Sequence, residues 1–199
     1  MKNRIDHLPQ VFSLTSMAHA IVSQSELTSQ FVIDATCGNG HDTAFLAQEV
    51  GNNGHVFAFD IQHDACVSTN AYMQKLGLQN IVTVIHDSHS NMTHSIPSEY
   101  HKNIAVIMFN LGYLPASEKI IKTQPLVTQS AIHQSLELLK VGGIITIAIY
   151  TDHPGGEEEL FIIQSLLSEL SPKHFRIAHL SYPYRKKKAP QLYIIYKER

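Results

Sequence analysis

A glycine-containing segment near the start of the chain has the composition of a ligand-binding loop between a strand and a helix. Residues 34–43 read DATCGNGHDT and follow a short apolar run. Gly38 and Gly40 allow a tight turn and a close approach of the backbone to a ligand. A dinucleotide fingerprint would require a third glycine where Thr43 stands. Asp34 would also repel a pyrophosphate, whereas its carboxylate can bind the cationic amino-acid end of S-adenosylmethionine (AdoMet), directly or through water.

Two further carboxylates follow apolar runs that have the character of strands. Asp60 comes 20 residues after Gly40, where an acid accepts hydrogen bonds from ribose hydroxyls. Asp87 lies where the amino group of an adenine would sit. A glycine loop alone would indicate no more than a tight turn, but three acids at successive strand ends predict one AdoMet crevice. The residues expected to bind the cofactor are Asp34, Thr36, Cys37, Gly38, Asn39, Gly40, His41, Asp42, Thr43, Asp60, Ile61, Gln62, Asp87, Ser88, His89, Asn110 and Leu111.

The fourth apolar run ends in Asn110-Leu-Gly-Tyr-Leu-Pro115, a candidate catalytic segment. It resembles a variant of the Asn/Asp-Pro-Pro-Tyr sequence of amino methyltransferases, with Leu-Gly in place of Pro-Pro. Oδ1 of Asn110 and the carbonyl of Leu111 can accept amine hydrogens and aim the nitrogen at a methyl donor. Tyr113 can stack on a flat base. The alternative is that Asn110 and Gly112 only shape a turn.

Two other segments could contact a substrate. His153 titrates near neutral pH and could take a proton from a substrate ammonium, although a loop or capping histidine is the plain alternative. Residues 185–188 (RKKK), flanked by Tyr182, Tyr184 and Tyr193, could contact phosphates and stack on bases of RNA, or form a solvated turn. The residues expected to contact the substrate are Tyr113, Leu114, Pro115, Tyr150, His153, Pro154, Gly155, Tyr184, Arg185, Lys186, Lys187 and Lys188, with Asn110, Tyr113 and His153 catalytic.

Composition limits the other classes of function. The net charge of -2 gives no general reason to expect nucleic-acid binding, so that hypothesis depends on local patches. The two cysteines form no CxxC pair, and the histidines have no HxxxH or HExxH spacing, so no metal is expected. No apolar stretch approaches a membrane span, and unpaired thiols suit the cytoplasm.

Strand and helix patterns alternate along the 199 residues, which predicts a Rossmann-like α/β fold with helices on both faces of the sheet. The strands are expected at residues 31–35, 56–60, 81–85, 104–110, 144–150, 175–182 and 192–196. Helices are expected at 13–25, from Ala44, at 65–76, 125–139 and 157–170. The last two strands are too close for a crossover helix and must form an antiparallel hairpin. We therefore expect one domain, 1–199, with a leading helical segment (1–27), a terminal hairpin (174–197), and seven mostly parallel strands, one of them antiparallel.

Three segments together, namely residues 34–43, Asn110 to Pro115 and His153 to Gly156, resemble the MnmM (formerly YtqB) family, once labelled as rRNA methylases. The resemblance covers nearly the whole chain; Cys37 stands where a small residue such as alanine is common. It implies a class I AdoMet-dependent methyltransferase. The implied reaction is N-methylation of the aminomethyl group of 5-aminomethyl(-2-thio)uridine at the tRNA wobble position.

The resemblance implies the anticodon region of tRNA as partner, with a splayed base stacking on Tyr113 or Tyr184. A homodimer is compatible with the sequence. Two other hypotheses remain open: a methyltransferase that acts on rRNA or a small-molecule amine, and an AdoMet- or RNA-binding module without catalysis.

Overall fold

The structure is a computed structural model, and it describes residues 13–112, 125–152, 154–182, 184 and 189–199. One sheet contains β1 (Phe31–Asp34), β2 (His55–Asp60), β3 (Val82–His86), β4 (Ile104–Leu111), β5 (Leu139–Ile149), β6 (Phe175–Leu180) and β7 (Gln191–Lys197). The order across the sheet is β3-β2-β1-β4-β5-β7-β6, and β7 runs antiparallel to both of its neighbours. The predicted sheet, with one antiparallel strand in a terminal hairpin, is confirmed.

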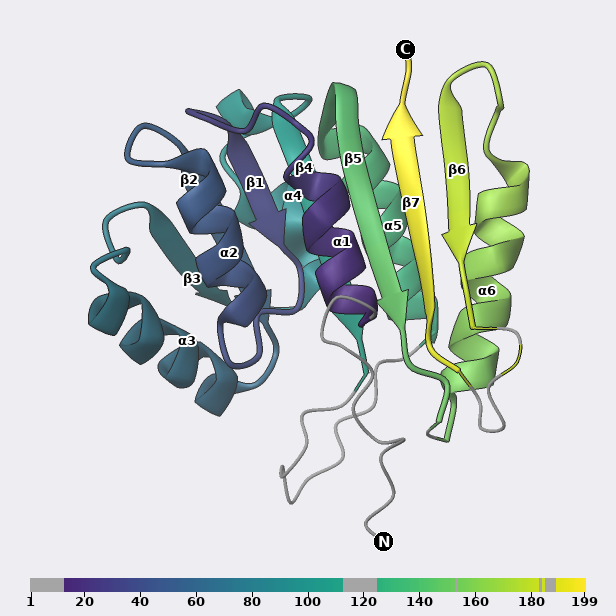
Figure 1. Cartoon of the computed structure of the whole chain (residues 1–199), viewed down its shortest axis with the longest axis horizontal. Coiled ribbons are helices and arrows are strands. Elements are labelled where there is room, and N and C mark those ends of the chain that lie inside the picture. The colour runs from purple at the N-terminus through teal and green to yellow at the C-terminus, as the bar shows by residue number, and fades with distance from the viewer. Residues whose placement is uncertain (1–12, 113–124, 153, 183, 185–188) are drawn as a thin grey trace, which may run out of the picture.

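Helices cover both faces of the sheet (Figure 1). One face carries α1 (Leu14–Val22), α2 (His41–Val50) and α3 (His63–Leu76); the other carries α4 (Met92–Ser95), α5 (Pro125–Leu138) and α6 (Gly156–Glu169). The 3₁₀ turns η2 (His89–Asn91) and η3 (Ser98–Tyr100) flank α4. Val32 and Met108 belong to the apolar cluster under the first group of helices, and Ile33 and Phe109 to the cluster under the second. Because both faces are covered, the central strands are apolar at nearly every position.

The central strand β4 contains one polar residue, Asn110, that core packing does not explain. Every residue from Ile104 to Leu111 is buried except Asn110, which is half-buried. Each buried large apolar side chain contributes about 1.5–3 kcal/mol to stability. A half-buried amide at the end of such a strand does not add to this core, so its role must lie in the polar contacts it makes.

β5 begins at Leu139 rather than at the predicted Ile144. Ile104 of β4 pairs with Leu139, whereas Val106 pairs with Ile144, so the residues between them bulge out of the strand. Gly142 has a φ of +80°, and a Cβ on Gly143 would lie 2.8 Å from the Leu139 side chain. The glycine pair that resembles a helix stop therefore also shapes a bulged entry into the strand.

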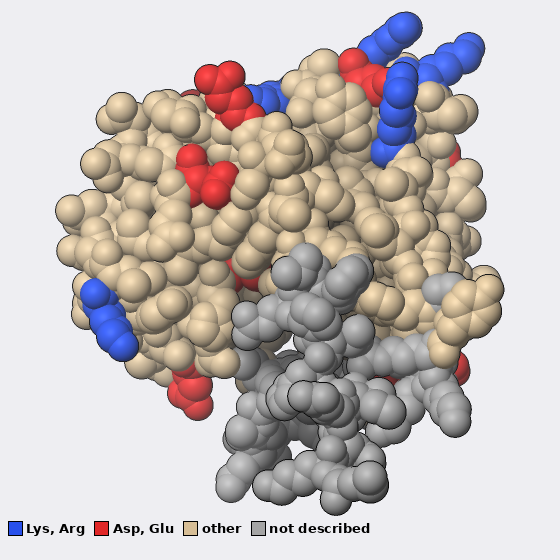
Figure 2. Space-filling view, viewed as in Figure 1, with Lys and Arg blue, Asp and Glu red and all other residues tan. Residues whose placement is uncertain are grey.

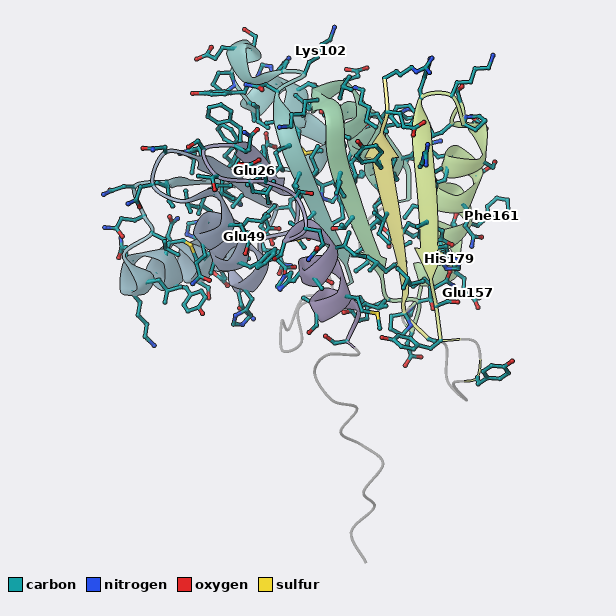
Figure 3. The ribbon with its side chains drawn as sticks, turned by 45° about the horizontal axis from the view of Figure 1, so that its top comes forward. Glu26, Glu49, Lys102, Glu157, Phe161 and His179 are labelled. Atoms are coloured by element: carbon teal, nitrogen blue, oxygen red, sulfur yellow. The ribbon has the colours of Figure 1, made fainter. Side chains whose placement is uncertain are left out.

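The strand order reverses direction between β1 and β4, and ligands of open α/β sheets bind at such a switch point, beyond the carboxyl ends of the strands. Figure 3 distinguishes the two edges of the sheet: Lys102 precedes β4 at one edge, and Glu157 lies in the first turn of α6 at the other, the carboxyl edge. Asp34, Asp60 and Asn110 all lie at the carboxyl ends of their strands. In the described part of the chain, no helix is long and apolar enough to span a membrane.

Candidate active site

The glycine loop after β1 is fixed by contacts with the elements that follow it. The amide of Gly38 donates to Oδ2 of Asp60 at 3.0 Å, and its carbonyl accepts from Oγ1 of Thr69, on α3, at 3.0 Å. Oδ1 of Asp60 accepts from the amide of Gln62 at 2.9 Å. Each oxygen of Asp60 therefore keeps a lone pair that a ribose hydroxyl could use.

Gly40 ends the loop directly before α2. Its φ of +81° is a left-handed conformation that favours glycine, and a Cβ there would lie 3.2 Å from the side chain of Thr69. The tight turn predicted from the two glycines is therefore present. It allows the backbone of the loop to lie close to α3 while α2 begins at His41.

Asp34 lies beneath this loop with only 1% of its surface exposed. Oδ1 accepts from the amide of Thr36 at 3.1 Å, and Oδ2 accepts from the hydroxyl of Thr43 at 2.6 Å. Burial, reinforced by the negative charge of Asp42, raises the pKa of Asp34 from 3.8 to about 7. A carboxyl group in such surroundings ionises more readily beside a cation, which suits the predicted contact with an ammonium group.

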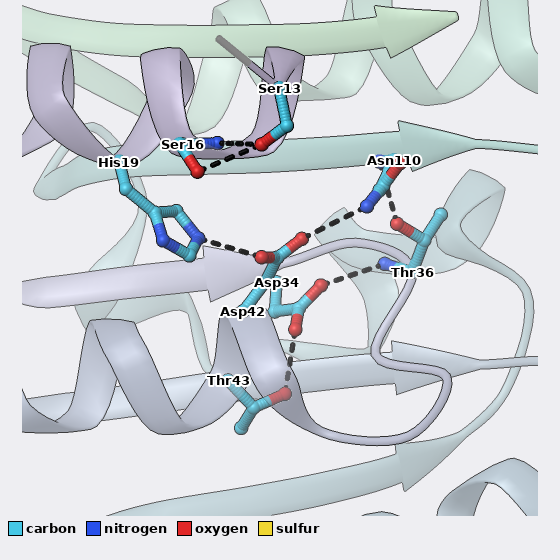
Figure 4. A network of polar contacts seen from close by, with 8 residues as sticks. All are labelled: Ser13, Ser16, His19, Asp34, Thr36, Asp42, Thr43 and Asn110. Atoms are coloured by element: carbon cyan, nitrogen blue, oxygen red, sulfur yellow. Dashed lines mark hydrogen bonds and ion pairs between the residues drawn. The ribbon is translucent and has the colours of Figure 1, made fainter. Parts of the chain in front are cut away.

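Asp42 lies on the first turn of α2 and joins three elements (Figure 4). Oδ1 accepts from Nε2 of His19, on α1, at 2.7 Å, and Oδ2 accepts from Nδ2 of Asn110, on β4, at 3.3 Å. Only 7% of Asp42 is exposed. The predicted loop and the predicted catalytic strand end are thus linked directly.

Asn110 is held a second time through its backbone, because its amide donates to Oγ1 of Thr36 at 2.8 Å. It lies within β4 and not in a turn, so shaping a turn does not account for it. The carbonyl of the next residue, Leu111, accepts from the amide of Tyr150 at 3.1 Å, and no other described residue uses its second lone pair. A Cβ on Gly112 would lie 3.5 Å from the ring of Tyr150, so the ends of β4 and β5 meet here.

Asp87 organises the segment that follows β3. Its Oδ1 accepts from the amide of Ser88 and from Nδ2 of Asn91, and its Oδ2 accepts from the hydroxyl of Ser95. Partial desolvation opposes ionisation, but these hydrogen bonds outweigh it and lower the pKa of Asp87. The contact with an adenine amino group, which would use the remaining capacity of Oδ2, stays a prediction.

His89 presents a buried acceptor close to the same strand ends. Its Nδ1 lies 3.2 Å from the carbonyl of Ala35, and burial lowers the pKa of the ring, which favours the neutral form. With Nδ1–H donating to that carbonyl, Nε2 carries the lone pair. Nε2 is buried and has no hydrogen-bond partner in the described residues. A ligand N–H or O–H group would satisfy it.

The predicted basic surface can be located only through its flanks. β6 runs parallel to β5, so the connection from β6 to β7 begins and ends at the carboxyl edge, and Tyr184 within it is 98% exposed. Tyr193 is not available to such a surface, because it is buried and its hydroxyl contacts Gln164 and Gln191. On the face in Figure 2, the described Lys and Arg side chains gather mainly near the C-terminus, at the opposite edge.

The remaining predicted substrate residues divide into two groups. Tyr150, Pro154 and Gly155 are exposed at the carboxyl end of β5, and Gly155, with a φ of +94°, caps α6. The others lie outside the described residues, namely Tyr113, Leu114, Pro115, His153, Arg185, Lys186, Lys187 and Lys188. Within the described residues, no group of three or more His, Cys, Asp and Glu side chains could hold a metal ion.

His19 and Thr69 belong to this arrangement but were not expected from the sequence. Thr69 is a fully buried polar residue on α3, on the helix face that also carries Cys66 and Met73. A threonine among apolar residues at helical spacing is a signal that could have been found. His19 gave no such signal, because nothing in its spacing relates α1 to α2.

These residues suit AdoMet on three independent observations. The buried Asp34 favours a cation, the backbone at Gly40 lies close against Thr69 of α3, and Nε2 of His89 has no donor among the described residues. In that fit, Asp34 and the loop would hold the amino-acid end, Asp60 the ribose, and Asp87 the adenine. Asn110 would face the transferred methyl group.

Comparisons with known proteins show which family the chain resembles. The sequence model of a family described as "Putative rRNA methylase" matches residues 56–196. A curated relative, the chloroplastic tRNA (mnm(5)s(2)U34)-methyltransferase of Arabidopsis thaliana, is 38% identical over 164 residues, which are 78% of this chain. The match spans 59% of the length of that relative.

Two solved structures resemble the chain over nearly its whole length. A protein described as a "putative rRNA-methylase" from Clostridium thermocellum is 38% identical and superposes with a TM-score of 0.87, over 92% of this chain and 96% of that one. A "putative methyltransferase" from Streptococcus mutans, solved in complex with SAH, is 32% identical with a TM-score of 0.81, over 92% and 97% of the two chains.

Proposed function

Because the chain belongs to the family described as "Putative rRNA methylase", we propose that it is an AdoMet-dependent methyltransferase acting on RNA. We further propose that its substrate is the aminomethyl group of 5-aminomethyl(-2-thio)uridine at the tRNA wobble position. The name of the Arabidopsis relative, a tRNA (mnm(5)s(2)U34)-methyltransferase, supports this choice of nucleoside. The Streptococcus mutans structure in complex with SAH supports the cofactor.

The observation that carries the proposal is the orientation of Asn110. Its Nδ2 is engaged by Asp42, which leaves Oδ1 as the group able to accept a hydrogen from an incoming amine. The Leu111 carbonyl, on the next residue, has a second lone pair that no described residue occupies. Two acceptors on adjacent residues suit a primary amine, which has two N–H groups and one lone pair to direct.

The reaction asks little of the protein beyond placement. When bound, AdoMet supplies a sulfonium methyl group that is open to in-line displacement. Asn110 and Leu111 orient the amine so that its lone pair forms the new N–C bond as the S–C bond breaks. An aliphatic ammonium must first lose a proton, and we assign His153 or a tyrosine hydroxyl to that step. The acids at the strand ends favour the cationic cofactor over a phosphate-rich one.

We propose that the anticodon region of tRNA docks at the carboxyl edge of the sheet, in the cytoplasm. Support comes from Tyr184, which is almost fully exposed there, and from the four cations of residues 185–188 in the same connection. A base splayed from the anticodon loop could stack on Tyr184 while the cations contact phosphates.

The test is nucleoside mass spectrometry of tRNA incubated with the protein and AdoMet. Unmethylated tRNA, taken from cells that lack this activity, should lose the aminomethyl nucleoside and gain its N-methyl form. Asn110→Ala should slow the conversion by about 100-fold, as expected for loss of substrate placement. Asn53→Ala, in the exposed turn before β2 at the opposite edge, is the matched control and should convert tRNA at the wild-type rate. Absence of conversion by a protein that binds AdoMet would reject the proposal.

The description of the family favours rRNA as a second candidate substrate. The same incubation with rRNA, followed by digestion and mass spectrometry, separates the two. Methylation of rRNA with none of tRNA would select this candidate. Methylation of a free amine that is unaffected by neutralising residues 185–188 would select a small-molecule substrate.

A further inference from the structure

His19 lies outside the strand ends and yet contacts the candidate site. It projects from α1, and its Nε2 lies 2.7 Å from Oδ1 of Asp42. Its ring stacks on Phe45, one turn further along α2, with a centroid separation of 3.8 Å and an interplanar angle of 9°. The stacking fixes the plane of the ring, and the hydrogen bond fixes its direction. His19 therefore holds Asp42 from α1, a helix that follows no described strand of the sheet.

The second oxygen of Asp42 determines which way the Asn110 amide faces. An ionised carboxylate accepts hydrogen bonds and cannot donate them. The contact of 3.3 Å between Oδ2 and Asn110 therefore requires Nδ2 toward Asp42 and Oδ1 away from it (Figure 4). The backbone of Asn110 is held separately by Thr36, so rotation of the side chain is the freedom that Asp42 removes.

Asp42 would be poorly held without His19. Its carboxylate lies close enough to Asp34 to raise the pKa of that group, so the two acids repel each other when both are ionised. The hydrogen bond to Asn110, at 3.3 Å, is longer than the 2.7 Å contact with His19 and does not by itself hold the carboxylate against this repulsion. His19 supplies the short contact that keeps Asp42 in place, and its side chain remains 26% exposed while doing so.

We propose that His19 is a positioning residue: through Asp42 it fixes the Asn110 side-chain amide with Oδ1 presented to the substrate nitrogen. The inference rests on the proposed role of Asn110 in methyl transfer. It assigns to α1 a part in the chemistry that neither the glycine loop nor the strand ends reveal. In this role His19 acts through Asp42 and not by contact with the substrate or the cofactor.

Two substitutions separate the hydrogen bond from the packing. His19→Phe keeps an aromatic ring against Phe45 but removes the donor, whereas His19→Gln keeps a side-chain N–H donor and removes the ring. His19→Phe should lower kcat by about tenfold to 100-fold and leave the KM for AdoMet within about twofold, because a displaced orienting group slows the chemical step. His19→Gln should recover most of kcat. His133→Phe, at an exposed position of α5, is the matched control and should leave kcat unchanged.

A second measurement needs neither tRNA nor turnover. The side-chain NH₂ resonances of Asn110, assigned by their loss in Asn110→Ala, should shift or broaden in His19→Phe and return toward wild type in His19→Gln. Urea denaturation of each variant checks that it is folded under the conditions of the NMR measurement. If wild-type protein methylates no tRNA, the proposed function fails, while these resonances still decide whether His19 restrains Asn110.

Three results would overturn the role of His19. One is an unchanged kcat in His19→Phe. Another is an Asn110 signal that is indifferent to both variants. The third is a His19→Phe protein that is less stable but whose folded molecules have the wild-type kcat. That result would mean that His19 only helps to pack α1 against α2.

Discussion

We predict that the buried carboxyl group of Asp34 lowers the free energy of unfolding as the pH rises, whereas an acid in a salt bridge raises it. Its pKa is about 7 in the folded protein against 3.8 ordinarily. Between these values the folded state holds a proton that the unfolded state has lost. Stability from this group is therefore complete below about pH 4 and is lost as the pH rises through about 7. At about 1.4 kcal/mol per pH unit, the difference approaches about 4 kcal/mol.

Asp34→Asn isolates this contribution. An amide at this position can accept from the amide of Thr36 and donate to the hydroxyl of Thr43, so it imitates the protonated acid without its titration. Comparing the two proteins cancels the titration of the thirteen histidines, which would otherwise dominate this range. Asp34→Asn should raise the free energy of unfolding by about 2 kcal/mol at about pH 5, where the acid of the unfolded chain is already ionised, and by up to about 4 kcal/mol at about pH 8.

Urea denaturation followed by far-UV circular dichroism measures the difference at each pH. Asp64→Asn, which removes an exposed carboxylate on α3, should show no comparable pH dependence. A difference between wild type and Asp34→Asn that stays constant from about pH 5 to pH 8 would refute the reasoning, because it would mean that Asp34 is ionised throughout.

The same titration should appear in cofactor binding. If the ammonium of AdoMet is held near Asp34, binding favours the ionised acid and releases a proton below about pH 7. Affinity in the wild type should then weaken by up to about tenfold per pH unit as the pH falls below 7. Isothermal titration calorimetry in buffers of different ionisation enthalpy counts the proton. Asp34→Asn should bind more weakly at about pH 8 and release none.

Three further predictions follow from local geometry. Gly40→Ala should destabilise the fold by about 1–2 kcal/mol and weaken AdoMet binding, because its Cβ would meet Thr69, whereas Gly77→Ala, with a similar φ but open space, should cost less and leave binding intact in calorimetry. Lys197→Met should destabilise by about 1–3 kcal/mol in urea, because Nζ donates to the carbonyls of Leu136 and Leu139, where α5 ends and β5 begins, while exposed Lys173→Met should not. The two thiols, whose pKa burial raises, should resist a disulfide reagent at about pH 8 until urea unfolds the chain, and rapid labelling of native protein would contradict their burial.

Most of the fold follows from the pattern of apolar runs, because a sheet covered on both faces leaves little room for polar residues in its strands. The predicted strand positions agree with β1 to β7, and the short connection after β6 correctly required an antiparallel hairpin. The start of β5 was missed because Gly142 and Gly143 resemble a helix end, whereas the bulge depends on the register between β4 and β5. Register is a property of two strands and is not visible in either one alone.

In the candidate site, too, some residues could be predicted from the sequence and others could not. Residues that adjoin a strand end, such as Asp34, Asp60 and Asn110, can be found in the sequence because strand direction alone brings them to one edge. His19 and Thr69 reach the site across helix packing, and one sequence gives no measure of which helical positions face each other. The sequence therefore indicates which groups can touch a ligand better than which groups hold them in place.

The choice of an acid at position 34 is itself an argument for a cationic ligand. An asparagine would satisfy Thr36 and Thr43 equally well and would avoid the desolvation of a buried carboxylate. Packing and hydrogen bonding therefore do not account for the charge, and Asp42 beside it makes the charge more costly. A bound cation offsets both penalties at once. On this reasoning, a ligand that matches AdoMet in shape but lacks its α-ammonium group should bind the wild type much more weakly. Wild type and Asp34→Asn should bind this analogue with similar affinity. If removal of the ammonium group weakens binding equally in the two proteins, the ammonium lies elsewhere.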